Sequence, residues 1–462
     1  MEGIQLKDVI LATGGTLLQG MPSVSIDKVS TDSRDVKSGD LFVALKGERF
    51  DGHDFIEEAV KKGAQALITH VIKDNLPGEI GVVLVKDTLK ALQDIAAFYR
   101  RLFNIPVTAV TGSTGKTTTK DMIHTLLAAN FNVLKSEGNL NNQIGLPLTL
   151  FKLNKSHQMT VVEMGMSGFN EISRLAAIAE PSLGVITNIG LSHIENLGSR
   201  ENILKAKLEL FERFDKRCTA ILNADDDLLW GIRDKLSFPV IYYGTKSGID
   251  LCADSIESLN GKGISYTLHS EGEKRRIRLN VPGRHNVYNS MAAVAVARYF
   301  GVEFEQIVNA FQNLKTHKMR LEITVLNGGI TVIDDAYNAS PDSNVSALSV
   351  LKDLPGKRKI AILGDMLELG KYSEYAHRFV GKAVLNNGID VLITRGNLSH
   401  IIADQALSMG MSDDRIFSLD SNADVVNMLE TFVESGDTIL VKGSRGMKME
   451  EIVMFSKTRW DK

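Results

Sequence analysis

The chain has 462 residues, of which 44% are hydrophobic and 24% are charged. This is ordinary globular composition, and at roughly 150 residues per domain the length predicts about three domains. Lysine and arginine number 53 and aspartate and glutamate 56, which leaves a net charge of −3. A chain so close to neutrality is not expected to bind nucleic acid through bulk charge, but a small basic site for an anionic ligand stays open.

Cysteine usage and hydropathy favour the cytoplasm. The two cysteines, Cys218 and Cys252, cannot form a disulfide framework, which is typical of a reducing compartment. No apolar run approaches the ~18 residues of a membrane-spanning helix. The segment 1–9 carries Glu2, Lys7 and Asp8, unlike a secretory signal peptide. We therefore expect a cytoplasmic protein without a transmembrane segment.

Apolar β-branched runs alternate with helical patterns, which predicts an α/β fold with largely parallel sheets. We expect a small N-terminal α/β domain, a central domain with a parallel sheet of the phosphate-loop ATPase type, and a C-terminal Rossmann-like doubly wound domain. Their expected bounds are 1–82, 83–314 and 315–462.

The expected elements follow in chain order. The N-terminal domain is predicted to hold strands at 41–45 and 66–68 and a helix over 55–62, and a linker helix over 87–103 follows. The central domain is predicted to hold strands at 107–110, 159–162, 183–186 and 220–222, a hairpin region over 245–274 and a helix over 286–299. The C-terminal domain is predicted to hold strands at 330–333, 359–363, 391–394 and 438–441 and a helix over 343–354.

The segment 111–118 has the composition of a phosphate-binding loop, and it lies between the strand 107–110 and a helical run over 119–129. Its glycines allow backbone N–H groups to turn toward phosphate oxygens at a helix N-terminus. The lysine can reach the β and γ phosphates, and the threonine after it can bind Mg²⁺. The residues predicted to contact a nucleotide are Gly112, Ser113, Thr114, Gly115, Lys116, Thr117 and Thr118. Val110 stands where the strict pattern begins with glycine, and the loop alone does not distinguish a kinase, GTPase, ATPase or ligase.

Three further residues are candidates for a metal site. Glu163 directly follows a predicted strand, at the sheet edge where ligands bind and where a Mg²⁺-binding acid is typical. His193 follows another strand-like run, and Lys207 lies beside the apolar face of a helix. Taken one by one, these residues are also compatible with a solvated strand end, a polar loop and a surface lysine whose stem packs on the core.

Taken together, these residues resemble the Mur ligase family, and within it the MurF type, over essentially the whole chain. The motifs that carry the resemblance lie at 31–34, 39–45, 111–118, 139–147, 163–165, 187–193, 206–207, 283–289, 334–339, 363–370 and 442–445. The runs Asp-Asp-Ala-Tyr-Asn-Ala at 334–339 and Leu-Gly-Asp-Met-Leu-Glu-Leu-Gly at 363–370 are the most specific of them.

The resemblance implies an ATP-dependent, ADP-forming ligase of peptidoglycan precursor synthesis. Such an enzyme joins D-alanyl-D-alanine to UDP-N-acetylmuramoyl-tripeptide (UDP-MurNAc-tripeptide) through an acyl phosphate, with ATP and two Mg²⁺ ions, as a monomer. The implied catalytic residues are Lys116, His193, Lys207 and Arg320, and the implied metal ligands are Thr117, Glu163, His193 and a carbamylated Lys207. The implied nucleotide contacts are Asn286 and Asn289 at adenine, Asp335 at the ribose and Arg320 at the γ-phosphate. The implied substrate contacts are Ser33 and Arg34 at the UDP moiety and Arg174 at the muramoyl-peptide.

The chain departs from the family pattern at three positions. Met319 precedes Arg320 where glycine is usual, Ser340 replaces an asparagine, and Asn170 stands where glycine is usual, so that any positive φ there falls on asparagine. Ligases of the MurE or folylpolyglutamate type share the phosphate loop and the metal pattern and stay as alternatives. A nucleotide-dependent switch or kinase and a catalytically silent scaffold are further alternatives from other classes.

Overall fold

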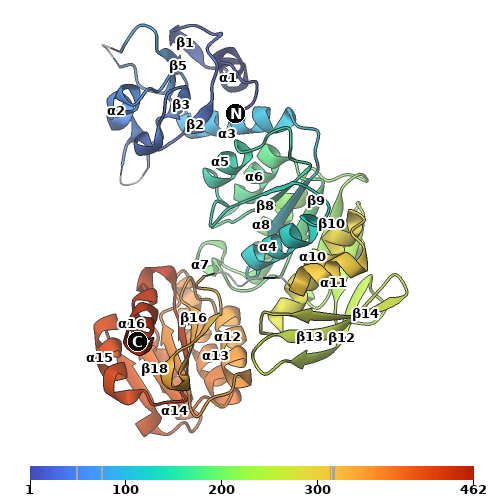
Figure 1. Ribbon diagram of the computed structural model, residues 1–462, viewed down its shortest axis with the longest axis vertical. Coiled ribbons are helices and arrows are strands. Elements are labelled where there is room, and N and C mark those ends of the chain that lie inside the picture. Colours follow the sequence, from blue (N-terminus) through green and yellow to red (C-terminus); the bar gives the residue numbers. More distant parts are fainter. Residues whose placement is uncertain (48–49, 74–75, 313, 315–317, 462) are drawn as a thin grey trace.

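The computed structural model describes residues 1–47, 50–73, 76–312, 314 and 318–461, and it contains three β-sheets, each built from its own stretch of chain. Figure 1 shows the N-terminal part in blue at the top, the central part in green and yellow, and the C-terminal part in orange and red at the bottom. The predicted fold class of three α/β domains is confirmed. The boundary expected at 314/315 adjoins residues 315–317, which lie outside the described residues.

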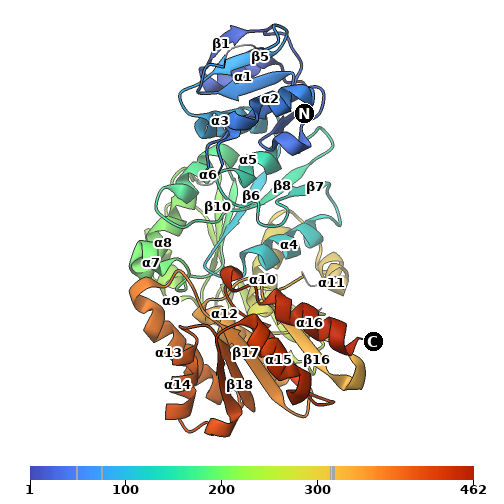
Figure 2. The same ribbon diagram turned by 90° about the vertical axis from the view of Figure 1, so that its left-hand side faces the viewer.

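The N-terminal sheet has five strands in the order β1-β5-β4-β3-β2, and only β1 is antiparallel to its neighbour. The strands are β1 (Thr16–Gln19), β2 (Lys28–Ser30), β3 (Asp40–Val43), β4 (Ala66–Thr69) and β5 (Gly81–Leu84), and the helices are α1 (Leu6–Thr13), α2 (Ile56–Lys61) and α3 (Thr88–Arg101). Helix α3 is the predicted linker: it begins at the cap Asp87 and packs on α1 on one side and on α5 and α6 of the central domain on the other. It therefore joins the two domains, as Figure 2 shows.

The central sheet has nine strands in the order β14-β13-β12-β11-β10-β9-β6-β8-β7. The strands are β6 (Val107–Thr111), β7 (Val133–Lys135), β8 (Met159–Glu163), β9 (Leu183–Ile186), β10 (Thr219–Asn223), β11 (Val240–Gly244), β12 (Leu251–Ser258), β13 (Ile264–Ser270) and β14 (Glu273–Leu279). The helices are α4 (Lys116–Leu127), α5 (Gly145–Leu150), α6 (Glu171–Ala179), α7 (Ile194–Leu197), α8 (Arg200–Leu208), α9 (Asp227–Trp230), α10 (His285–Tyr299) and α11 (Phe304–Gln312). The strands from β7 to β12 run parallel, while β12, β13 and β14 pair antiparallel, so the predicted hairpin region extends the parallel sheet.

The C-terminal sheet has six strands in the order β15-β16-β20-β17-β18-β19, and only β15 is antiparallel to its neighbour. The strands are β15 (Glu322–Val325), β16 (Thr331–Asp335), β17 (Lys359–Gly364), β18 (Val391–Arg395), β19 (Ile416–Leu419) and β20 (Thr438–Lys442). The helices are α12 (Pro341–Asp353), α13 (Ser373–Asn386), α14 (His400–Ser408), α15 (Asn422–Phe432) and α16 (Glu450–Trp460).

Parallel strands place their carboxyl ends at one edge of a sheet, and this positions the site. Strands β6 and β8 are buried along their whole length, as expected for strands with both faces covered. The phosphate loop follows the end of β6, and β8 ends at Glu163. In the part of the chain that the structure describes, no helix has the length and apolar character needed to span a bilayer.

Candidate functional site

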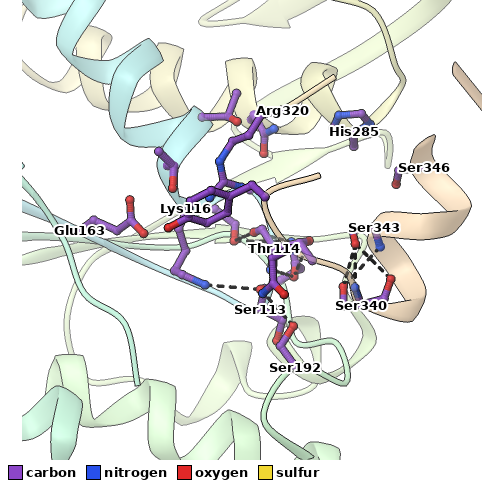
Figure 3. A pocket seen from close by; sticks show the side chains of 18 of the residues that line it. Ser113, Thr114, Lys116, Glu163, Ser192, His285, Arg320, Ser340, Ser343 and Ser346 are labelled. Atoms are coloured by element: carbon purple, nitrogen blue, oxygen red, sulfur yellow. Dashed lines mark hydrogen bonds between the residues drawn. The ribbon is translucent and has the colours of Figure 1, made fainter. Parts of the chain in front are cut away.

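A cavity of about 610 Å³ opens between the central and C-terminal domains. The central domain contributes the phosphate-loop segment, the end of β8 and the start of α10. The C-terminal domain contributes Arg320, Asp335, Tyr337 and Lys442. Figure 3 shows side chains from both domains around the same space. The cavity is therefore complete only when the two domains are in contact.

The phosphate loop needs glycine at two positions for steric reasons. Gly115 has φ +79 and precedes α4, and a Cβ there would stand 2.4 Å from Oδ1 of Asn289. Gly112 has φ +151, and a Cβ there would stand 1.8 Å from Oγ1 of Thr187. Gly112 does not line the cavity, whereas the loop residues from Ser113 to Thr118 all do. The strand, loop and helix N-terminus thus form the arrangement that binds phosphate.

Residues after β9 hold the loop in this shape, and the sequence-based prediction gave them no role in the site. The backbone N–H of Thr114 donates to Oδ1 of Asn188 at 3.0 Å, and the Thr187 hydroxyl donates to the Thr114 carbonyl at 2.6 Å. The backbone N–H of Gly190 donates to the Ser113 hydroxyl at 2.9 Å. The sequence does carry a signal for these residues, because they form a polar run directly after the buried strand β9. That strand pairs with β6 and therefore lies beside the loop.

Lys116 lies folded along its own loop. Its Nζ donates to the Gly112 carbonyl at 2.8 Å, and Ser113 provides a second carbonyl at 3.4 Å. Burial lowers the pKa of Lys116; the Glu163 carboxylate opposes this shift and Arg320 adds to it. A cation held at the mouth of an N–H-lined loop is placed to neutralise phosphate charge.

Glu163 is suited to binding a cation. It ends β8 with 2% of its surface exposed, and its Oε1 accepts a hydrogen bond of 2.8 Å from Nδ2 of Asn141. Its Oε2 is buried and has no hydrogen-bond partner among the described residues. An unpaired buried carboxylate oxygen is costly unless a ligand completes it.

Lys207 is buried on α8 with 2% exposure and does not line the cavity. Burial lowers its pKa well below the usual value, and the charge of Lys116 adds to the effect. The structure gives it no ion-pair partner among the described residues. This shift raises the share of the neutral amine relative to an ordinary lysine, and the neutral amine is the nucleophilic form.

His193 follows β9 and lies at the domain interface. Its Nδ1 stands 2.8 Å from Oε2 of Glu368, which belongs to the C-terminal domain. In the ranges that the structure covers, no group of three or more histidine, cysteine, aspartate or glutamate side chains could enclose a metal ion. A metal held here would thus need oxygen ligands of other kinds, such as a hydroxyl, a phosphate or a carbamate.

Asn286 and Asn289 line the cavity, but their amides also bond within the protein. Nδ2 of Asn286 donates to the Pro282 carbonyl at 2.6 Å, and Nδ2 of Asn289 donates to Oδ1 of Asn286 at 3.0 Å. Oδ1 of Asn289 accepts from the Thr119 hydroxyl at 3.2 Å. The last of these bonds links α10 to α4, and the two asparagines form part of the cavity wall.

Two C-terminal residues are held in place by neighbours to which the sequence-based prediction gave no role in the site. The Arg320 guanidinium stacks on the Tyr337 ring at 4.3 Å from its centre. Nζ of Lys442, a residue only 2% exposed, stands 2.5 Å from Oδ2 of Asp335. Burial raises the pKa of Asp335, while Lys442 counteracts this shift.

His285 also lines the cavity, and the sequence-based prediction did not include it. Burial, with the Lys442 charge in addition, lowers its pKa to about 4. The imidazole is therefore neutral at physiological pH, when it can both donate and accept a hydrogen bond.

The structure does not bring Ser33, Arg34 and Arg174 to the cavity. The Ser33 hydroxyl donates to Glu58 at 3.0 Å, and exposed Arg34 pairs with Asp32 at 2.7 Å, both in the N-terminal domain. Arg174 donates to Oε1 of Gln143 on the central domain.

The three departures from the family pattern have defined structures. Asn170 has φ +64, as expected for a position where glycine is usual. Met319 has φ +61, so a left-handed backbone is retained there on a residue with a side chain. The Ser340 hydroxyl caps α12 by accepting from the Ser343 N–H, which gives this side chain a structural role.

A second pocket of about 220 Å³ adjoins the main cavity. Both share Ser192, His193 and Glu368 in their walls. Small and apolar side chains, Ala339 and Leu367 among them, line this second pocket, together with Arg445. The second pocket thus offers one cationic side chain and space for small apolar groups of a ligand.

The comparisons with known proteins agree with this geometry. Three family descriptions match in order: "Mur ligase family, catalytic domain" over residues 25–100, "Mur ligase middle domain" over 110–297 and "Mur ligase, glutamate ligase domain" over 319–445. Two relatives named UDP-N-acetylmuramoyl-tripeptide–D-alanyl-D-alanine ligase are similar over nearly the full length. The one from Bacillus subtilis is 41% identical over 97% of both chains, and the one from Escherichia coli is 36% identical over 97% of this chain and 96% of the other.

Solved structures of MurF are similar to the whole chain as well. MurF from Acinetobacter baumannii superposes with a TM-score of 0.91 at 32% identity, covering 98% of each chain. MurF from Thermotoga maritima in complex with ADP superposes with a TM-score of 0.83 at 28% identity, covering 95% of this chain and 99% of the other. With full-length relatives above 30% identity and all three family descriptions matched, the chain belongs to the Mur ligase family.

Proposed function

We propose that this protein is the ATP-dependent ligase that joins D-alanyl-D-alanine to UDP-MurNAc-tripeptide, releasing ADP and phosphate. The observation that carries the proposal is the cavity itself, in which a phosphate loop faces Arg320 and Asp335 from another domain. The names of the full-length relatives supply the substrates. A nucleotide-dependent switch or a kinase also needs a phosphate loop, but neither activity requires the second pocket that adjoins the main cavity.

The phosphate loop would bind ATP through its N–H groups, with Lys116 at the β and γ phosphates. The guanidinium of Arg320, oriented by Tyr337, would neutralise charge on the transferred phosphoryl group. Asp335 would accept a hydrogen bond from the ribose, and Asn286 and Asn289 would form the wall beside adenine.

Mg²⁺ fits the donors that are present. The buried Oε2 of Glu163 and the Thr117 hydroxyl would hold one ion, because hard cations bind oxygen donors and this oxygen has no hydrogen-bond partner among the described residues. His193 would be a ligand of a second ion. The neutral form of the Lys207 amine would add to carbon dioxide, forming an N–C bond and releasing a proton, to give a carbamate ligand for that second ion. When bound, Mg²⁺ supplies neutralisation of phosphate charge.

The reaction has two steps. The tripeptide carboxylate attacks the γ-phosphorus and ADP leaves, which converts a poor electrophile into an acyl phosphate. The dipeptide amine then attacks the acyl carbon, loses a proton, and inorganic phosphate leaves. An acyl phosphate reacts with water, so closure of the two domains around the cavity serves to protect it.

The second pocket suits the dipeptide. Its walls carry Ala339 and Leu367, which match methyl side chains, and Arg445, which matches a carboxylate. Because it adjoins the main cavity, an amine entering from it would reach the acyl phosphate. Ser33 and Arg34 of the N-terminal domain would bind the UDP moiety, and Arg174 the muramoyl-peptide between the two. A reducing cytoplasm, where ATP and nucleotide-linked sugars are made, is the proposed location, and the monomer is the proposed state.

The test measures phosphate release from ATP and Mg²⁺ with UDP-MurNAc-tripeptide, with and without D-alanyl-D-alanine. Release that requires both substrates, with a pentapeptide product of the expected mass, supports the proposal. Release with a single free amino acid in place of the dipeptide assigns the chain to another ligase of the family, and nucleotide binding without turnover assigns it to a switch or scaffold. Lys116→Ala should abolish turnover while the protein stays folded.

A further inference from the structure

The loop 365–369 forms part of the wall of the second pocket. It follows β17 at the carboxyl edge of the C-terminal sheet, and it contains most of the run at 363–370 that is among the most specific motifs of the sequence. Leu367 and Leu369 line the second pocket and not the main cavity, whereas Glu368 lines both. The shape of this loop therefore sets the shape of the second pocket.

Backbone and side-chain bonds hold the beginning of the loop. The N–H of Leu367 donates to the Ser444 hydroxyl at 2.9 Å, and the N–H of Ser444 donates to the Asp365 carbonyl at 3.1 Å. Ser444 follows β20 and lines the same pocket. Oδ1 of Asp365 accepts from the N–H groups of Leu398 and Ser399 at 3.0 and 2.7 Å. The loop is thus joined both to another part of the pocket wall and to the segment before α14.

A further bond to the loop comes from His377 on α13, whose side chain lines neither pocket. The N–H of Met366 donates to Nε2 of His377 at 3.1 Å. Nδ1 of the same ring lies 2.7 Å from the Ser373 carbonyl, one turn earlier on the helix, and 3.3 Å from the Ser373 hydroxyl. His377 and Met366 are both 0% exposed, so this bond is shielded from water.

The two partners determine which ring nitrogen carries the proton. A backbone N–H can only donate, so Nε2 must present its lone pair to Met366, and the proton is left on Nδ1, where the Ser373 carbonyl accepts it. A doubly protonated ring would leave the Met366 N–H without an acceptor. Burial lowers the pKa of His377 and so favours the neutral ring, although the Ser373 carbonyl and the charge of Asp365 oppose this shift. Both ring nitrogens are therefore engaged within the fold.

We propose that His377 is a positioning residue for the dipeptide site: by accepting the Met366 N–H, it holds the loop 365–369 in the shape that the second pocket requires. The inference rests on the proposed function in one respect, since it takes the second pocket as the site of D-alanyl-D-alanine. A buried N–H without an acceptor is costly, so without His377 the loop shifts to satisfy it. Binding of the dipeptide must then restore the loop, which weakens affinity for the dipeptide and not for ATP.

The test compares His377→Gln with His377→Asn in the full chain. The amide oxygen of glutamine reaches the place of Nε2 and can accept the Met366 N–H, whereas asparagine reaches only the place of Nδ1. Val384→Ala is the control for a loosened core, because Val384 is buried on the same helix about two turns further along. Circular dichroism and thermal unfolding establish that each variant is folded.

His377→Asn should raise KM for D-alanyl-D-alanine by about 5- to 50-fold, in line with the cost of an unpaired buried N–H. Both kcat at saturating dipeptide and KM for ATP should stay within about twofold of the wild type, which separates a binding effect from an effect on the chemical step. His377→Gln should recover most of the affinity. Val384→Ala should unfold at a lower temperature and keep the KM values of the wild type.

A second measurement reports on the bond itself and needs no substrate. In a two-dimensional ¹H–¹⁵N spectrum of the imidazoles at about pH 8, where ordinary histidines are neutral, His377 should carry its proton on Nδ1. Its signal is assigned by its loss in His377→Gln. Hydrogen exchange of the Met366 amide, followed in protein labelled with ¹⁵N-methionine, should be slow in the wild type and in His377→Gln and faster in His377→Asn.

An unchanged KM for the dipeptide in folded His377→Asn would overturn the inference, as would an equal rise in Val384→Ala or no recovery in His377→Gln. Should His377→Asn fail to fold, the wild type decides: a proton on Nε2 or rapid exchange of the Met366 amide overturns the inference, and the reverse supports it. An inactive wild type would overturn the proposed function instead, and the spectrum and the exchange rate would still report whether His377 holds the loop.

Discussion

The carboxamide of Asn141 donates a hydrogen bond of 2.8 Å to Oε1 of Glu163 and leaves Oε2 of that carboxylate buried and unpaired among the described residues. The backbone of Asn141 is held in turn, because its carbonyl accepts from the Gly165 N–H at 2.8 Å. The amide thus fixes which carboxylate oxygen faces the cavity. The same carboxylate acts on Lys116, since its charge opposes the lowering of the lysine pKa by burial.

Asn141→Ala should weaken metal binding and leave the fold intact. The carboxylate of Glu163 gains freedom to rotate, and loss of an outer partner of a metal ligand costs about 10- to 100-fold in affinity or activity. The Mg²⁺ concentration for half-maximal ligase rate should rise by that factor, while KM for D-alanyl-D-alanine stays within about twofold. An unchanged Mg²⁺ curve would contradict the role given to Asn141.

Lys207→Ala should reduce turnover to background if the amine is carbamylated. Burial, with the charge of Lys116 in addition, lowers the pKa of Lys207, which increases the share of the neutral amine that reacts with carbon dioxide. Short carboxylates such as acetate should restore part of the activity, because they replace the oxygens of the carbamate. Lys205→Ala is the matched control, since Lys205 is exposed on the same helix.

A direct reading comes from ¹³C NMR with labelled bicarbonate. Wild type and Lys205→Ala should each show a carbamate resonance, and Lys207→Ala should lack it. Absence of the resonance from the wild type would exclude the carbamate, and a metal at this site would then need another oxygen donor.

Sequence reasoning identified the strands that are buried on both faces and missed those at the edges. Strands β6, β8 and β9 are buried along their whole length, and the expected ranges agree with the observed ones within a residue. Strand β14, Glu-Lys-Arg-Arg-Ile-Arg-Leu, lies at an edge and buries only Ile277 and Leu279, so its charged residues hide the pattern. Strands β1, β2, β5, β7, β11, β15 and β19 also went unpredicted, and most of them are too short to carry a periodic signal.

The residues of the candidate site also differ in how well the sequence predicts them. Residues next to a strand end, such as Lys116 and Glu163, can be found from the local sequence, because strand ends at one sheet edge lie together. Lys442 and Glu368 come from another domain, and their positions depend on how the two domains dock. The left-handed Asn170 was predictable from the expected glycine, whereas the contact between Asn188 and Thr114 required the packing of β9 against β6.

Replacing Met319 by glycine should stabilise the protein relative to replacing it by alanine. Met319 has φ +61, where a Cβ costs about 1 kcal/mol and glycine has no such penalty. Both variants lose the same side-chain contacts, so their difference isolates the backbone. Thermal unfolding should give Met319→Gly the higher midpoint by a few degrees. The reverse order would show that the left-handed conformation is unstrained.

Stability should fall as pH rises because of Asp334. Burial raises its pKa to about 6, although nearby Lys457 counteracts the shift. The folded chain therefore keeps a proton that the unfolded chain releases near pH 4. The free energy of unfolding therefore falls between about pH 4 and pH 6, and above pH 6 the folded state carries a poorly solvated carboxylate.

Asp334→Asn should remove that cost, since asparagine stays neutral and can still accept the Ala336 N–H. After allowance for partial solvent screening, the gain at pH 7.5 should be about 2 kcal/mol, and it should vanish near pH 4. The thermal midpoint of the C-terminal domain measures it. Asp404→Asn, on an exposed helix face, should show no such pH dependence.

Arg445→Ala should raise KM for D-alanyl-D-alanine at least 10-fold and leave KM for ATP within about twofold. The guanidinium is the cation of the second pocket, and a hydrogen bond to a charged group contributes about 1.5–3 kcal/mol. Arg445 also pairs with Glu450 at 3.0 Å, so Glu450→Gln should leave the carboxylate contact free to form. Arg459→Ala, which replaces an exposed arginine of α16, is the control for charge.

D-alanyl-D-alaninamide, which lacks the carboxylate, should be a poor substrate for the wild type and no worse for Arg445→Ala. Equal discrimination between dipeptide and amide by both proteins would place the carboxylate elsewhere, because a residue that binds this group must lose its preference when the cation is removed.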